Sequence, residues 1–193
     1  MNLKNLRTLK LLEEIDKDCT LSQRDLAKAL NISLGSVNLF IKRLIKRGYF
    51  SVTAIPKNRV KYILTPKGVE EKTRLAYEFI QYSFEFYRNT REKLQTLFQV
   101  LVQQGVRRIA FYGASDLAEI AYVSLQKTPI DIVAIVDDDK SGQILLGLPI
   151  LASSCLATLL FDRILITHTD ATMKVLELMV EKHIPSEKVV LLT

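Results

Sequence analysis

Polar and basic side chains gather between residues 33 and 47. Within the segment LGSVNLFIKRLIK, Val37, Ile41 and Leu44 recur at helical spacing and form an inward face. The polar residues then point outward, where Ser and Asn can hydrogen-bond base edges and Lys and Arg can contact phosphates. The candidates are Ser33, Ser36, Asn38, Lys42, Arg43 and Lys46. An ordinary solvated helix face is the alternative interpretation.

Two β-rich runs, 49–55 and 60–65, follow this segment and flank the four residues PKNR. The pattern predicts a β-hairpin with Lys57 and Arg59 at its tip and Lys61 just beyond. Three helices followed by a basic hairpin indicate a winged helix, whose wing can reach the minor groove or the DNA backbone. A wing with a purely structural role is the alternative.

Short helices must position these side chains. Leucines at helical spacing predict a first helix over about 3–16. Thr20 or Ser22 can cap a second helix, and Ser22 with Asp25 approximates a capping box. The NIS sequence makes a tight turn, Ser33 caps the third helix and Gly48 ends it. Two helices joined by a turn of three or four residues predict a helix-turn-helix.

The distribution of charge separates this basic part from the rest of the chain. The net charge is +6 over 193 residues, but residues 1–65 carry +8, residues 66–106 carry +1 and residues 107–193 carry −3. A small basic domain is typical of proteins that bind a polyanion, and the acidic last third indicates a second domain with a different partner. The partner predicted for the first domain is double-stranded DNA.

The N-terminal part resembles winged-helix transcriptional regulators of the MarR type, and in particular those associated with exopolysaccharide gene clusters. The resemblance covers about residues 5–80 and is carried by LSQRDLAKALNISLGSVNLFIKRLIKRGYF and KYILTPKG. It implies a dimeric transcriptional regulator with a recognition helix at about 34–46.

A long helix is predicted over 66–105. Pro66 suits the first position of a helix, and neither glycine nor proline occurs from Val69 to Gln104. Its apolar side must be buried, and a second copy of the same helix is the simplest partner, which predicts a homodimer. Packing against its own C-terminal domain and a break near Asn89-Thr90 are the alternatives. The apolar side comprises Leu75, Phe79, Tyr82, Phe86, Tyr87, Leu94, Leu97, Phe98 and Leu101.

Apolar strands alternate with helices from residue 106 onward, which predicts a parallel sheet covered on both faces. We expect a Rossmann-like domain over 106–193 with about five strands in the order 3-2-1-4-5, and a helix around 154–160. The fold class is therefore α/β, with a winged helix-turn-helix over 1–65, the long connecting helix, and this C-terminal sheet domain.

The first turn of that domain partly fits the dinucleotide-binding pattern G-x-G-x-x-G/A. Gly113 supplies the first position and Ala118 the third, but Ser115 replaces the second glycine. Asp116 adds negative charge where a phosphate would lie. Asp137, 24 residues after Gly113, is near the position of an acid that holds a ribose. Ser115 can donate a hydrogen bond to a phosphate as well as block it.

This segment is also similar to the nucleotide-binding part of sugar-nucleotide dehydratases and epimerases. The resemblance covers about 106–170 and is carried by FYGASDLAEIA and IVAIVDDDKSGQILLGLPI. It implies a pocket at the carboxyl ends of the strands. A nucleotide-sugar, NAD(H), a CoA-like ligand or no ligand remain open. The candidate ligand-binding residues are Gly113, Ser115, Asp116, Asp137, Asp138, Thr167 and His168.

The residues do not indicate an enzyme, because no nucleophile, base and acid occur as a set and Tyr122 has no lysine four residues later. Cys19 and Cys155 lack metal-ligand spacing. No membrane partner is expected, since no apolar run approaches the roughly 20 residues of a membrane span, and the N-terminus lacks a signal core, which predicts a cytoplasmic protein. We therefore expect a DNA-binding transcriptional regulator of polysaccharide-related genes with a small-molecule effector. The alternative is a DNA-located interaction protein whose C-terminal domain binds no small molecule.

Overall fold

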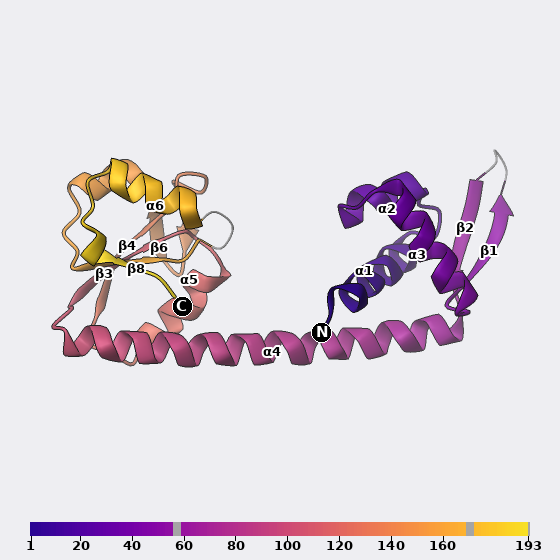
Figure 1. Ribbon diagram of the computed structural model, residues 1–193, viewed down its shortest axis with the longest axis horizontal. Coiled ribbons are helices and arrows are strands. Elements are labelled where there is room, and N and C mark those ends of the chain that lie inside the picture. Colours follow the sequence, from indigo (N-terminus) through magenta and orange to yellow (C-terminus); the bar gives the residue numbers. More distant parts are fainter. Residues whose placement is uncertain (56–58, 169–171, 193) are drawn as a thin grey trace. The chain divides into compact units, whose positions relative to one another are not determined.

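The computed structural model describes residues 1–55, 59–168 and 172–192 (Figure 1). The chain divides into two compact units, Met1–Glu85 and Phe86–Thr193. One helix, α4 (Pro66–Gln103), contributes residues to both units, so the division falls inside a helix rather than in a loop.

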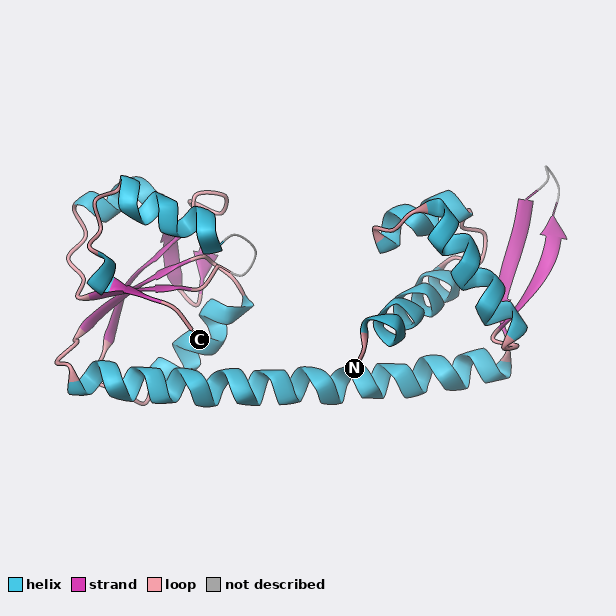
Figure 2. Ribbon diagram, viewed as in Figure 1, coloured by secondary structure: helices cyan, strands magenta, loops and turns pink. Residues whose placement is uncertain are grey.

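The first unit is a winged helix-turn-helix, as predicted, with three helices and a two-stranded antiparallel sheet (Figure 2). The side chain and the backbone of Ser22 exchange hydrogen bonds with Asp25 in a capping box, and Asn31 ends the second helix in the left-handed conformation. Ser33 then caps the third helix by accepting a hydrogen bond from the Ser36 N–H. The elements are α1 (Leu3–Lys17), α2 (Gln23–Leu30), α3 (Leu34–Lys46), β1 (Phe50–Ile55) and β2 (Arg59–Leu64).

A single apolar core holds this unit together. Leu9, Leu12 and Ile15 of α1 pack with Leu26 of α2. Further buried residues from α3, the sheet and α4 complete the core, so the start of α4 is part of the winged unit. These further residues are Val37, Ile41, Leu44, Phe50, Tyr62 and Leu75.

Helix α4 is continuous over 38 residues, so the alternative of a break near Asn89-Thr90 is wrong. Leu94, Phe98 and Leu101 are buried in the core of the second unit. These three residues therefore pack against their own C-terminal domain, which was the alternative to packing against a second copy of the helix. Residues 79–89 are exposed to solvent all around the helix, and they include several aromatic side chains.

The second unit is built on a six-stranded sheet in the order β5-β6-β4-β3-β7-β8. The five strands β6, β4, β3, β7 and β8 pair in parallel and have the predicted order 3-2-1-4-5, and β5 adds an antiparallel edge strand. The strands are β3 (Arg108–Tyr112), β4 (Asp131–Val136), β5 (Ile144–Leu145), β6 (Leu148–Leu151), β7 (Arg163–Ile166) and β8 (Val189–Val190).

Helices cover both faces of this sheet. On one face, Ile109 and Phe111 of β3 pack with α5 (Asp116–Leu125) and with the second half of α4. On the other face, Ala110 and Tyr112 pack with α6 (Thr172–Glu181) and with residues near a short 3-10 helix (Figure 1). The helix predicted around 154–160 is present as a shorter 3-10 helix, η1 (Ser153–Ala157), whose turn ends at Thr158. A second 3-10 turn, η2 (Ser186–Lys188), leads into β8.

Candidate nucleic-acid interface and ligand pocket

The outward face of α3 carries most of the predicted polar and basic residues. Val37, Ile41 and Leu44 are buried, and at about 100° per residue the opposite side of the helix is centred on Leu39 and Lys46. Arg43 and Lys42 lie within that outward side, and both are exposed. Ser36 and Asn38, both partly exposed, lie at its two margins, and the Ser36 hydroxyl is 2.8 Å from the hydroxyl of exposed Ser33.

The basic residues of this face are not neutralised within the protein. Over the described part of the chain, no carboxylate oxygen lies within 4.0 Å of the side-chain nitrogens of Lys42, Arg43 or Lys46. Their charges are therefore available to a polyanion, and each phosphate contact would release counterions.

The wing is only partly described. Lys57 lies outside the described residues, and Arg59 begins β2, opposite Ile55. Lys61 pairs with Thr53 in the ladder and is partly exposed. The two strands pair as an antiparallel hairpin, as predicted, but Arg59, which was expected at the tip, belongs to β2. The contribution of the wing to DNA binding stays a prediction.

In the second unit, a cavity of about 300 Å³ opens at the carboxyl ends of the parallel strands. Three of the predicted ligand-binding residues line it: Asp137, Asp138 and His168. Gly113, Ser115 and Thr167 form the loops beside the cavity without lining it, and Asp116 is the exposed first residue of α5. Asp139, at the end of the acidic loop 137–139 that was expected to bound the pocket, also lines it. The sequence did not indicate the other three lining residues: Tyr112, Val175 and Leu178.

The carboxylate of Asp137 is used by the protein itself. Its Oδ2 accepts a hydrogen bond from the Ala114 N–H (2.8 Å), and its Oδ1 accepts from the N–H groups of Asp139 (3.0 Å) and Lys140 (3.2 Å). The residue is only 7% exposed. Asp137 therefore ties the loop after β4 to the loop after β3. Similarly, Asp138 accepts a hydrogen bond from the Ser153 N–H (2.7 Å).

The loops after β3 and β7 are also tied to each other. The Ser115 hydroxyl donates to the Thr167 carbonyl (2.6 Å) and accepts from the Leu117 N–H (3.2 Å) at the start of α5. Gly113 has φ +110°, and a Cβ there would lie 2.5 Å from the backbone nitrogen of His168. Only glycine fits this turn, because the neighbouring loop takes up the space of a side chain.

The cavity is acidic. Three aspartates and one histidine line it, and no lysine or arginine does among the described residues. Burial, followed by the negative charges of Asp138 and Asp137, raises the pKa of Tyr112 to about 12. Tyr112 therefore stays protonated at neutral pH and can donate a hydrogen bond. This lining favours the hydroxyl or amino groups of a ligand over its phosphates.

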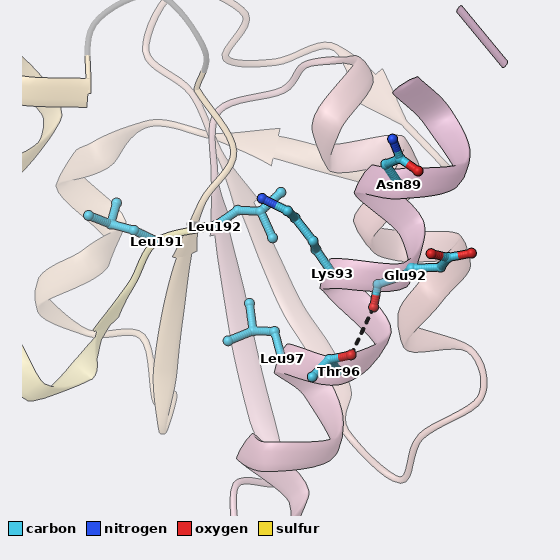
Figure 3. A pocket seen from close by; sticks show the side chains of 7 residues that line it. All are labelled: Asn89, Glu92, Lys93, Thr96, Leu97, Leu191 and Leu192. Atoms are coloured by element: carbon cyan, nitrogen blue, oxygen red, sulfur yellow. Dashed lines mark hydrogen bonds between the residues drawn. The ribbon is translucent and has the colours of Figure 1, made fainter. Parts of the chain in front are cut away.

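A larger groove of about 570 Å³ lies elsewhere in the second unit (Figure 3). Helix α4 forms one wall with four polar side chains and a leucine, and Leu191 and Leu192, just after β8, form the other. The sequence does not indicate this groove, because its walls are about a hundred residues apart in the chain. The residues from α4 are Asn89, Glu92, Lys93, Thr96 and Leu97.

Two further classes of site are not found. Within residues 1–55, 59–168 and 172–192, no group of three or more His, Cys, Asp or Glu side chains could hold a metal ion. None of the helices in this part of the chain is both long and apolar enough to cross a membrane.

Comparisons with known proteins give one family match within each of the two units of the chain. Residues 4–50 match a family described as winged helix-turn-helix DNA-binding, and residues 105–190 match a family described as C2185-like, N-terminal. No curated protein matches.

Among solved structures, the transcriptional regulator PcaV from Streptomyces coelicolor is 19% identical over 51% of this chain and 74% of its own, with a TM-score of 0.42. A MarR family regulator from Silicibacter pomeroyi is 20% identical over 50% and 67%, with a TM-score of 0.38. BpsR from Bordetella bronchiseptica is 29% identical over 40% and 63%, with a TM-score of 0.34.

The hydrogen bonds of Asp137 predict a structural role that its neighbour Asp139 does not share. Replacing Asp137 by alanine leaves three N–H groups without their acceptor. The N–H of Ala114 is buried, and one buried unsatisfied group costs about 1–3 kcal/mol. We expect Asp137→Ala to speed amide hydrogen exchange across β3 and β4, measured by mass spectrometry. Asp139→Ala is the matched control and should leave that exchange unchanged. Equal exchange in the two variants would contradict the assignment.

Proposed function

We propose that this protein is a homodimeric, DNA-binding transcriptional regulator of the MarR type whose Rossmann-like C-terminal domain senses a nucleotide-sugar or a related nucleotide. The observation that carries the proposal is the cationic outward face of α3 within a winged helix-turn-helix unit. The resemblance of the N-terminal part further supports polysaccharide-related genes as the target.

In this proposal α3 enters the major groove. Ser36 and Asn38 hydrogen-bond base edges, while Lys42, Arg43 and Lys46 contact phosphates on either side. The wing, with Lys57, Arg59 and Lys61, contacts the adjacent backbone or minor groove. Two such units in a dimer would bind half-sites about 34 Å apart, which is one turn of DNA.

The middle of α4 supports the homodimer. Tyr77, Phe84 and Phe86 are each at least 60% exposed, and residues 79–89 are exposed on every side of the helix. A helix with apolar residues around most of its circumference is normally buried. A second copy of α4 would bury this surface in both subunits at once, because a two-fold interface uses the same residues twice.

The acidic cavity supports an effector bound by its hydroxyl groups. In the proposed complex the sugar or nucleoside part lies against Asp138, Asp139 and Tyr112, and the phosphates point away from the three carboxylates. NAD(H) fits less well, because Asp137, the expected ribose ligand, and Ser115 are engaged by the protein. These same hydrogen bonds favour a second candidate function, an interaction domain that binds no small molecule.

DNA binding is tested first by its dependence on salt. We expect affinity for duplex DNA to fall steeply between about 50 and 200 mM salt, and Lys42→Ala to weaken binding to every sequence and to reduce the salt slope by about 1 per lost contact. Fluorescence anisotropy measures both. Lys127→Ala removes the same charge from the second unit and is the control. An affinity for DNA that is independent of salt would refute the mode of binding.

The proposed dimer predicts an effect of two aromatic residues on one side of α4. Phe79 and Phe86 are exposed and lie two turns apart on that side. Phe79→Ser combined with Phe86→Ser should raise the dimer dissociation constant by roughly tenfold or more, since buried aromatic side chains dominate interface energies. Sedimentation equilibrium gives this constant. Glu85→Ser, between the two positions, is the control and should have little effect. A wild-type chain that remains monomeric at micromolar concentration would overturn the homodimer.

The effector is tested by calorimetric titration of the full chain with UDP-glucose and with NADH. We expect the nucleotide-sugar to bind, and Asp139→Ala to weaken its binding several-fold while leaving DNA affinity without ligand unchanged. Gly113 is unsuitable for this test because any side chain there strains the fold. If wild-type and variant proteins bind neither compound and DNA affinity responds to neither, the interaction-domain alternative is favoured.

A further inference from the structure

We propose that Leu39 recognises the 5-methyl group of thymine in the major groove. This role rests on the proposed function, because it requires α3 to enter DNA. Leu39 is 50% exposed, although it lies at the centre of the outward face of α3. The cationic side chains of Lys42 and Arg43 follow it by three and four residues and so lie beside it on the same side of the helix.

The surroundings of Leu39 argue against a protein partner at this position. The core of a protein–protein interface is depleted in charged residues, whereas Leu39 is bordered on its own face by Ser36, Lys42, Arg43 and Lys46. Single exposed apolar residues are common on protein surfaces, but this one lies in the middle of an unneutralised cationic face. A polyanion that also presents an apolar group satisfies both features.

Gly35 leaves room for a base edge to approach Leu39. A helical side chain lies over the turn that precedes it, so the side chain of Leu39 lies toward Gly35, four residues earlier. A Cβ built at Gly35 meets nothing within 4 Å, and the residue does not have a positive φ. Neither packing nor backbone conformation therefore requires glycine here. Because Gly35 has no side chain, it leaves a shallow depression on the outward face of α3.

Thymine is the base that fits this place. In the major groove the base edges present hydrogen-bond donors and acceptors, and thymine adds a methyl group. Contact with that methyl removes apolar surface of both partners from water. Burial of one methyl-sized group corresponds to about a fourfold change in affinity.

The test is a double-mutant cycle between protein and DNA. The full chain first selects duplexes from a randomised pool, and the best duplex is resynthesised with deoxyuridine at one thymine position at a time, which removes only the methyl group. Affinities for each duplex are then measured by anisotropy for the wild type and for Leu39→Ala. The control is Ile45→Ala, an exposed apolar residue of α3 that lies roughly 120° around the helix from Leu39.

We expect uridine at one or two positions in each half-site to weaken wild-type binding about fourfold per methyl, and to have no effect on Leu39→Ala. Ile45→Ala should behave like the wild type. Gly35→Ala should weaken binding to methylated and unmethylated duplexes alike, since its methyl group holds the face away from the bases.

Two kinds of failure are distinguishable. If a preferred duplex is selected but uridine has no effect at any position, or has the same effect on Leu39→Ala as on the wild type, the role of Leu39 is refuted and the proposed function stands. If no duplex is preferred and binding is independent of salt, the proposed function fails, and the role of Leu39 fails with it.

Discussion

The structure depends on one constraint: helix α4 must bury apolar residues in two separate cores. Leu75 packs in the winged unit, whereas Leu94, Phe98 and Leu101 pack beneath the sheet of the second unit. No glycine or proline interrupts the chain between residues 69 and 104, so the helix continues through the segment that neither core covers. That segment is rich in aromatic residues, and its exposure is a direct consequence of one helix serving both cores.

The features that sequence analysis predicted correctly are those determined by local chemistry. Ser22 and Ser33 cap α2 and α3 because a serine hydroxyl accepts the N–H groups that the first helical turn leaves free. The parallel sheet followed from the alternation of strands and helices, and the order 3-2-1-4-5 from the Rossmann-like arrangement expected for such an alternation. Helical periodicity likewise identified the buried face of α3.

The features that could not be predicted depend on contacts between distant residues. An acid at the end of the second strand suits a ribose, yet Asp137 accepts three backbone N–H groups from its own and a neighbouring loop. Sequence spacing places the carboxylate at the correct edge of the sheet but does not specify its partners. The groove between α4 and Leu191 was missed for the same reason (Figure 3). Tertiary packing also decides which apolar residues of α4 are buried in the core of the second unit and which are exposed to solvent.

A ligand in the acidic cavity can affect DNA binding only if it binds one arrangement of the protein more tightly than another. A tenfold change in DNA affinity requires about 1.4 kcal/mol of such preference. Under the proposed function, strand β3 links the cavity to α4 through two consecutive residues. Tyr112 lines the cavity, whereas Phe111 points to the other face of the sheet and packs in the core that contains Leu94, Phe98 and Leu101 of α4. Under the proposed function, a ligand that displaced Tyr112 would therefore act on α4 through the packing of the adjacent Phe111.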